Sequence, residues 1–341
     1  MKRFLRRIAV LSLVALFAAA AFAEVAGYKT FETADEDAPV VYFTKDISPE
    51  GLVKVYKAMG WTPKGKVGVK ISTGEPPASN YLRPQLIGAL VKDELHGTIV
   101  ECNTAYGGSR ISAALHHQVV KDHGFLEIAD FDLQDEKGFL KIPVNGGANL
   151  KYDYVGKDFK NYGSYLVLSH FKGHAMGGFG GAIKNLSIGF GSGQSAKKSG
   201  KILIHTGGRA ESGTLHDFSR YTQGNENQLK FLESMAEAAK GVCDYMGNET
   251  GIAFVNVMNR LSVDCDCNGN PEEPDMHDIG ILASTDPLAI DQASVDLVFT
   301  AADSAKLVER IETRQGRHTL EHAEKIGLGK GSRAYRLVVV E

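Results

Sequence analysis

Short apolar runs alternate with longer amphipathic stretches along most of the chain. The runs are rich in Val, Ile and Leu and largely unbroken, which is typical of strands buried on both faces. Strands are predicted at residues 40–43, 67–71, 98–102, 165–169, 252–257, 279–283 and 335–340. Helices are predicted from Ser48 onward and over residues 84–94, 111–123, 228–246, 287–299, 303–314 and 319–326. This alternation predicts an α/β fold in which a mainly parallel sheet is covered by helices on both faces.

Polar segments of unusual composition directly follow five of the predicted strands. These segments are residues 70–77, 101–110, 169–174, 256–267 and 284–287. In an open α/β sheet, ligands bind at the carboxyl ends of the strands. The five segments are therefore expected to meet at one edge of the sheet and to form a site there.

The segment 169–186 is the most informative of them, because it combines basic side chains with five glycines. The basic residues are His170, Lys172, His174 and Lys184. Glycine lets the backbone approach a ligand where a Cβ atom would collide. Imidazoles titrate near neutrality, so His170 and His174 are candidate acid–base groups or metal ligands, with Lys172 beside them. Lys184 and Asn185 begin a predicted helix, where amides and a cation favour a carboxylate or phosphate.

Further candidates lie after the second and third predicted strands. Glu75 is a candidate binding residue, although its Gly-Glu-Pro-Pro context also suits a rigid turn. Asn103 and Arg110 flank a Tyr-Gly-Gly sequence that suits the approach of an anion, or equally an exposed loop. His116, on the following helix, is a candidate catalytic residue, with a solvated helix face as the alternative.

The second strong constellation is a run of alternating acids and cysteines. It consists of Asp264, Cys265, Asp266 and Cys267. Such concentrated negative charge is costly unless a cation or hydrogen-bond donors compensate it. Thiolates with imidazoles suit zinc, iron or nickel, so we expect this run and His205 to bind a transition metal. The alternatives are a calcium-like or structural acidic loop, or a disulfide among the four cysteines.

Composition narrows the class of partner. The 341 residues are 43% hydrophobic and 23% charged, which is ordinary for a globular protein. A net charge of −3 argues against nucleic acid and anionic membranes as partners. Residues 38–341 are expected to form one domain, with two lobes around a cleft, 38–190 and 200–341, as the alternative organisation.

The N-terminus has the pattern of an export signal. A positively charged region precedes an apolar stretch over residues 8–20 and an Ala-Phe-Ala sequence at 21–23. This predicts a cleaved signal peptide over residues 1–23 and a periplasmic or secreted protein. A membrane anchor is disfavoured because the apolar stretch is short, whereas an Arg-Arg pair also permits twin-arginine export. Residues 24–37 are expected to be a flexible, acidic lead-in.

The motifs also carry a family resemblance. The chain resembles the family called domain of unknown function 362, often labelled uncharacterised Fe–S-centre proteins. The matching segments are residues 41–43, 74–76, 80–84, 102–110 with His116, 169–174, 177–186, 200–201 with His205, 264–267, 278–294 and 321–329. The resemblance implies that Asn80, in the second segment, belongs to the substrate-binding set.

The chain departs from that family in one respect. Many relatives carry a ferredoxin-like insert after the position of His205, whereas residues 206–229 hold no cysteine. No ferredoxin-type 4Fe-4S cluster is therefore expected. The glycine-rich His/Lys loop is also distantly similar to nickel-pincer lactate racemases, which use histidines and lysine in an α/β cleft.

Two functional hypotheses follow from these observations. The first is an exported metal-dependent enzyme, an oxidoreductase or isomerase, that performs redox or proton-transfer chemistry on a small anionic metabolite. Lys172, Lys184 and Arg110 would then hold a carboxylate or phosphate. The alternative is a non-catalytic periplasmic protein that binds a metal ion or metabolite in the same cleft.

Overall fold

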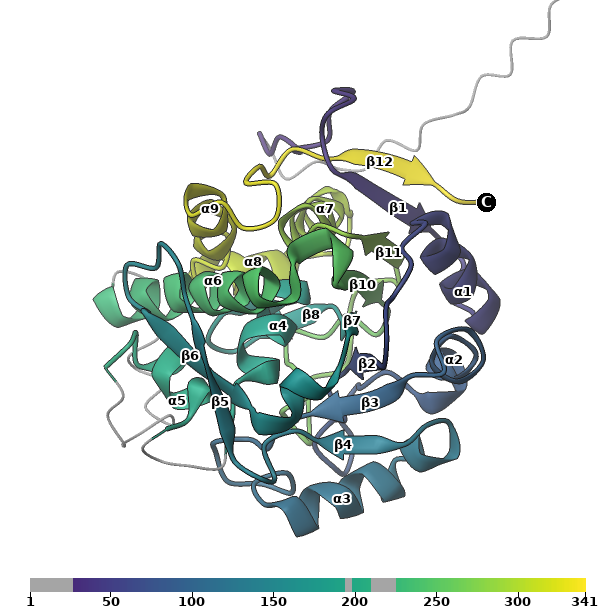
Figure 1. The fold of residues 1–341 in the computed structure, drawn as a ribbon. Helices are drawn as coiled ribbons and strands as arrows, with labels where there is room; N and C mark the ends of the chain where they lie inside the picture. Colours follow the sequence, from purple (N-terminus) through teal and green to yellow (C-terminus); the bar gives the residue numbers. More distant parts are fainter. Residues whose placement is uncertain (1–26, 194–197, 210–224) are drawn as a thin grey trace, which may run out of the picture.

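An eight-stranded sheet organises the computed structural model, which describes residues 27–193, 198–209 and 225–341 (Figure 1). The predicted signal peptide, residues 1–23, lies outside the described residues. The strand order is β12-β1-β11-β10-β7-β2-β3-β4. The strands are β1 (Val40–Thr44), β2 (Val67–Lys70), β3 (Thr98–Glu101), β4 (Phe131–Leu133), β7 (Ser164–His170), β10 (Ile252–Met258), β11 (Gly280–Ser284) and β12 (Arg336–Val339).

The sheet is mainly parallel, as predicted. Strands β10, β7, β2, β3 and β4 pair in parallel with their neighbours. Strand β11 is the exception, because it runs antiparallel to both β1 and β10. The expectation that residues 284–287 join the other four segments is therefore wrong, since the carboxyl end of β11 lies at the opposite edge.

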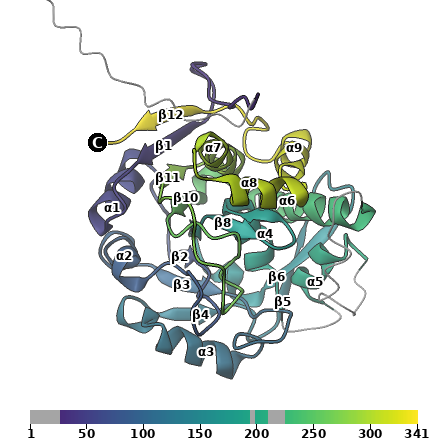
Figure 2. The same cartoon turned by 180° about the vertical axis from the view of Figure 1, so that it is seen from behind.

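Helices cover both faces of the sheet, as the views in Figures 1 and 2 show. Leu166 and Leu168 of β7 pack on one face with α1, α2 and α3, whereas Tyr165 and Val167 pack on the other with α4, α6, α7, α8 and α9. This alternation follows from the two-residue period of a strand. The helices are α1 (Pro49–Ala58), α2 (Pro84–Gly88), α3 (Ala113–Asp122), α4 (Ala182–Phe190), α6 (Glu226–Met246), α7 (Pro287–Thr300), α8 (Ala305–Thr313) and α9 (His318–Lys325).

Helix ends follow the predicted caps. Ser48 accepts a hydrogen bond from the Gly51 amide at the start of α1, and Asp286 accepts two from the first turn of α7. The predicted helix 84–94 is α2 continued by a π-helical turn, Ala89–Glu94. Short 3₁₀ turns occur at Phe125–Glu127, Lys157–Asn161 and Asn248–Thr250.

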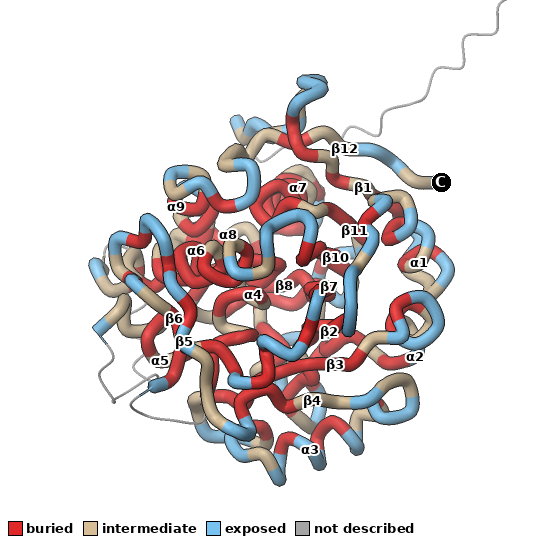
Figure 3. Tube along the Cα trace, in the orientation of Figure 1, coloured by how far each residue is buried: buried red, intermediate tan, exposed pale blue. Residues whose placement is uncertain are grey.

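Two small hairpins complete the fold. The irregular stretch 126–162 contains one of them, β5 (Phe139–Pro143) with β6 (Tyr152–Gly156), which packs with the short helix α5 (Gly200–His205) and with α6. The second was not predicted and lies within the glycine-rich segment: β8 (Lys172–His174) pairs with β9 (Gly178–Gly180). Figure 3 shows that the tube is buried along the central strands β7 and β10 and along β8.

Part of the lead-in that was expected to be flexible is held on the domain. The Tyr28 hydroxyl and the Phe31 amide each donate to the Asp296 carboxylate of α7, both at 2.6 Å. Strand β12 then lies beside β1, so both ends of the domain join the same sheet edge. Within the described residues, no helix is both long and apolar enough to span a bilayer.

Candidate functional site

The carboxyl ends of β2, β3, β7 and β10 open onto one cavity of about 420 Å³. Four of the five polar segments contribute to its walls, and α5 adds two more side chains. Of the residues predicted from sequence, those that line the cavity are Arg110, His170, Lys172, His174, Lys184, Asn185, His205, Asp264, Cys265, Asp266 and Cys267. Segments that are far apart in the chain thus share one enclosed space.

The β8–β9 hairpin fixes the orientation of His174. The Gly177 amide donates to Nδ1 of His174 at 2.8 Å, so the proton of the neutral ring is on Nε2. Burial, together with the positive charge of Lys184 and its neighbours, lowers the pKa of His174 well below its usual value. His174 is therefore a neutral imidazole with a defined tautomer.

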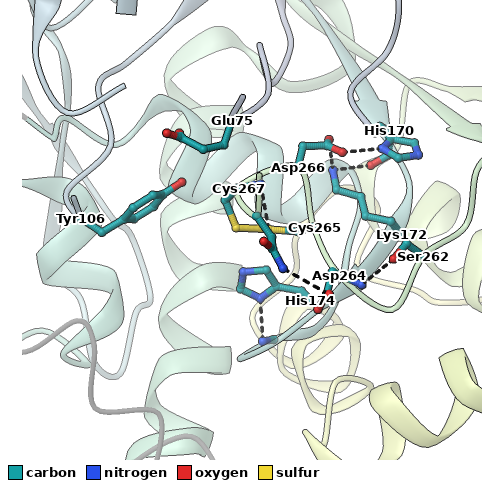
Figure 4. Close-up of a disulfide and its surroundings, with 12 residues drawn as sticks. Glu75, Tyr106, His170, Lys172, His174, Ser262, Asp264, Cys265, Asp266 and Cys267 are labelled. Carbon is teal, nitrogen blue, oxygen red and sulfur yellow. Dashed lines mark hydrogen bonds and ion pairs between the residues drawn. A yellow bond between two sulfur atoms is a disulfide. The ribbon is translucent and has the colours of Figure 1, made fainter. Parts of the chain in front are cut away.

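The ring of His174 points toward a disulfide between Cys265 and Cys267 (Figure 4). One ring nitrogen and the two Sγ atoms all lie within 4.8 Å of one another. Among the described residues, this is the group of donor atoms that could hold a metal ion, and two thiolates with an imidazole suit zinc-like ions. In the disulfide, however, the sulfurs are not thiolates, so ligation requires reduction first.

The two acids beside these cysteines are compensated by the protein itself. Asp266 pairs with His170 Nδ1 at 2.8 Å and with Lys172 Nζ at 3.0 Å. Burial opposes ionisation of Asp266, but His170 and Lys172 lower the pKa of its carboxyl far below the usual value. Asp264 accepts the Glu272 amide at 3.1 Å and faces Arg310 at 3.4 Å. Both carboxylates therefore lie outside the group of donor atoms described above.

His170 differs from His174 in its surroundings. Its Nε2 faces the Asn259 carbonyl at 2.7 Å, while Nδ1 faces Asp266. Both ring nitrogens are thus occupied by contacts within the protein. Neither nitrogen offers a lone pair to a metal, so His170 positions Asp266 and the 264–267 loop.

A second buried network lies behind the cavity wall. Arg110 donates to Glu75 and to Glu101, both at 3.1 Å. Glu101 also faces His116 Nε2 at 3.0 Å. Glu75 and His116, both predicted from sequence, thus hold Arg110 and its network in place and do not themselves line the cavity. Asn80 and Asn103 are buried outside the lining as well, and the Asn103 amide groups donate to Asp135.

The first turn of α4 does not offer free amides to an anion. The Ala182 and Ile183 amides donate to the Asp291 carboxylate at 2.7 and 2.9 Å. Burial raises the pKa of Asp291 to about 6, against the hydrogen bonds that it accepts. The expectation that these amides bind a carboxylate or phosphate of a ligand is therefore wrong, because the carboxylate of Asp291 in α7 already occupies them.

Lys184, by contrast, faces the cavity without a direct partner among the described residues. Within the part of the chain that the structure describes, no hydrogen bond or ion pair engages its Nζ. Burial and the nearby charge of Lys172 lower the pKa of Lys184 to about 7. Lys184 is thus poorly solvated and exchanges its proton near neutral pH.

Two lysines in the lining were missed by the sequence analysis. Lys70 Nζ donates to the Ile71 carbonyl and to Asn185 Oδ1, and burial lowers its pKa to about 8. Lys201 Nζ donates to the Ile188 and Gly191 carbonyls at 2.5 and 2.7 Å. For Lys70 the available signal was its place in an apolar run, since such a side chain must enter the sheet edge or the core, whereas Lys201 follows a Gly/Ser/Lys-rich stretch that carries no such signal.

His205 also lines the cavity. Its Nδ1 faces the Lys201 carbonyl at 2.6 Å, and its ring stacks on Phe231. Burial lowers the pKa of His205 to about 4. Its ring is therefore neutral and belongs to the α5–α6 packing, outside the His174–cysteine group.

Comparison with known proteins gives a fold likeness and a family. No curated protein matches the sequence. Among solved structures, the lactate racemase apoprotein from Thermoanaerobacterium thermosaccharolyticum matches with 13% identity and a TM-score of 0.37. The match covers 63% of this chain and 50% of the racemase, and it supports no argument about activity. The profile of the family described as Domain of unknown function (DUF362) matches residues 67–296, more than half of the chain, so the protein belongs to that family.

Proposed function

We propose that the protein is an exported enzyme that binds a small anionic molecule in this cavity and transfers a proton to it. The observation that carries the proposal is the charge of three lining lysines. Lys70, Lys184 and Lys201 have no carboxylate within ion-pair distance among the described residues. Buried cations without counter-ions are costly, and an anionic ligand offsets that cost.

The residues of the cavity wall have different roles, some in anion binding and others in the chemistry. Lys184 is the direct anion-binding group, because its Nζ has no partner to give up. Arg110 is already held by Glu75 and Glu101, which offset its charge, so it shapes the cavity wall and is not the group that binds the anion. His174 carries its proton on Nε2, on the side of the cysteines, and donates a hydrogen bond to the bound molecule, whereas Lys184, whose pKa is about 7, supplies the proton.

Calorimetric titration with small mono- and dicarboxylates and with inorganic phosphate tests the binding step. We expect one site whose affinity falls as the pH rises from about 6 to about 9, because Lys184 loses its proton in this range. Lys172, Arg110, Lys201 and Asp266 face the same ammonium and set its pKa. Lys184→Met should weaken binding about tenfold or more, whereas the exposed Lys57→Met should not change it. Equal affinities for both variants would contradict the proposal.

A non-catalytic binding protein is distinguished from an enzyme at His174. In an enzyme, His174→Ala lowers the rate by a larger factor than it weakens affinity for the anion. In a binding protein, the same substitution changes affinity alone. Rates for this comparison come from proton exchange at the carbon next to the carboxylate, and from the assay described in the next subsection.

Metal binding is the second candidate function, supported by the proximity of His174, Cys265 and Cys267. It applies to the reduced protein, in which the two sulfurs can act as thiolates. Elemental analysis after anaerobic reduction tests it, with cobalt as a spectroscopic probe. One equivalent of metal that is lost in His174→Ala and in Cys265→Ser would support this candidate.

A further inference from the structure

The two sulfurs of the Cys265–Cys267 disulfide have different surroundings. Cys265 is 5% exposed, whereas Cys267 is partly exposed, and both line the cavity. The Cys267 amide donates to Sγ of Cys265 at 3.3 Å. A hydrogen bond of this kind stabilises a thiolate more than a neutral sulfur. Cys265 is therefore the better leaving group, and Cys267 is the accessible point of attack.

His174 places a hydrogen-bond donor beside the Cys265–Cys267 bond. The Gly177 amide occupies Nδ1, so the ring presents Nε2–H to the sulfurs, which lie within 4.8 Å of the ring (Figure 4). An imidazole N–H at this position can donate a hydrogen bond to a departing sulfur and so stabilise it as a thiolate. The hairpin thus supplies a donor whose orientation is set by the backbone.

The other two cysteines do not take part. Cys102 and Cys243 are both fully buried, and burial raises the pKa of each thiol well above its usual value. Cys102 also donates to the Phe190 carbonyl at 3.3 Å. A buried, protonated thiol is a poor nucleophile. This leaves one disulfide that can react, in a cavity of positive charge.

We infer that this disulfide is a thiol–disulfide exchange centre for small anionic thiols and their disulfides. The inference rests on the anion-binding cavity of the proposed function and assigns it a substrate class. Charge selects the substrate, because Lys184 attracts its carboxylate. The disulfide supplies the reactivity, so the substrate must itself carry a thiol or a disulfide.

The reaction proceeds in two balanced steps. The thiolate of the first substrate attacks Sγ of Cys267, the Cys265–Cys267 bond breaks, and Cys265 leaves as a thiolate that accepts a hydrogen bond from His174 Nε2 and takes its proton from solvent. The thiolate of a second substrate then attacks the substrate sulfur of the mixed disulfide and releases Cys267 as a thiolate, which solvent protonates. Two substrate thiols are oxidised to one substrate disulfide, and the protein disulfide is reduced to two thiols. The reverse sequence lets the reduced protein reduce an anionic disulfide.

The test follows exchange in the full-length protein. Samples are quenched with acid, their free thiols are alkylated, and the masses of the products are measured by mass spectrometry. The oxidised protein is mixed with mercaptopropionate or with neutral mercaptoethanol, and the reduced protein with dithiodipropionate or with bis(hydroxyethyl) disulfide. We expect the ratio of charged to neutral rates to fall about tenfold in Lys184→Met. Cys265→Ser should accumulate a mixed disulfide on Cys267, because the resolving sulfur is gone, whereas Cys243→Ser should behave like the wild type.

Three outcomes would overturn the inference. The first is an unchanged charge preference in Lys184→Met, and the second is the absence of any adduct in Cys265→Ser. The third is uptake of one cobalt ion by the reduced protein without exchange at a rate above that of a free disulfide. Calorimetry on Cys267→Ser separates the two proposals. If one of these outcomes is observed while this variant still binds the anion, the anion site stands and only the exchange inference fails.

Discussion

At the scale of single residues, Glu101 is the carboxylate that holds the wall behind the cavity. Its oxygens accept hydrogen bonds from the Thr73 amide and hydroxyl and face Arg110 and His116. Burial would raise the pKa of Glu101, but Arg110 and His116 lower it well below its usual value. The groups around Glu101 thus stabilise its ionised form.

Glu101→Gln keeps the shape of this side chain and removes its charge. We expect the free energy of unfolding to fall by about 3 kcal/mol, because Arg110 loses one of its two buried counter-ions and His116 loses a charged acceptor. Urea denaturation at neutral pH measures this loss. The matched control is Glu136→Gln, which disrupts the exposed pair with His117 and should cost less than about 1 kcal/mol. Similar losses for both variants would contradict the role of Glu101.

Residue types were easier to predict from sequence than their partners. The pattern identified the histidines, the cysteines and Lys184, because these side chains follow apolar runs. It did not reveal that Lys172 and His170 compensate Asp266, since an ion pair between residues 94 or more positions apart depends on the fold. For the same reason, the disulfide remained one of several options for Cys265 and Cys267.

At the scale of elements, strand β8 is fitted against the loop that carries the disulfide. The Gly173 amide donates to the Ser262 carbonyl at 2.8 Å. A Cβ atom on Gly173 would lie 2.2 Å from the Val263 carbonyl oxygen, which is closer than van der Waals contact allows. The lack of a side chain at this glycine thus sets the distance between His174 and the two sulfurs.

Gly173→Ala should force β8 away from residues 262–263. We expect a loss of about 1 to 3 kcal/mol in the free energy of unfolding, because the added methyl group meets backbone that cannot rotate away. Exchange at the disulfide should slow as well, since His174 moves with the strand. Gly107→Ala is the stability control, because an added Cβ there meets nothing within 4 Å. Equal melting temperatures for the two variants would show that the close approach is not needed.

Strand direction was the element-level property that the sequence could not provide. A continuous apolar run indicates a buried strand but carries no signal for its orientation. Four of the five polar segments meet because β2, β3, β7 and β10 are parallel, and the fifth is displaced because β11 reverses. The β8–β9 hairpin was missed because its glycines and basic residues resemble a loop, and only pairing across Gly173 makes it a strand.

For the whole molecule, the buried lysines make the free energy of unfolding depend on pH. In the folded protein the pKa of Lys184 is about 7 and that of Lys70 about 8, both lowered first by burial, whereas an unfolded lysine has its usual value of 10.5. Between these values the unfolded chain binds more protons than the folded protein. The free energy of unfolding therefore rises with pH in this window. Below about pH 7 the lysines are charged in both states, so they no longer make the free energy depend on pH.

Lys184→Met isolates this contribution. From about pH 7 to about pH 9 the wild type should gain on the order of 1 kcal/mol from Lys184, and the variant should lack that gain. The variant should also be the more stable protein at the lower pH, because it no longer buries an ammonium without a counter-ion. Urea unfolding at a series of pH values measures both effects, and the exposed Lys57→Met should keep the slope of the wild type. Two outcomes would contradict this: a wild-type dependence of the free energy of unfolding on pH in Lys184→Met, or a wild-type free energy that falls as the pH rises. Either would mean that Lys184 is solvated or paired in the folded protein. The argument for an anionic ligand would then lose its basis.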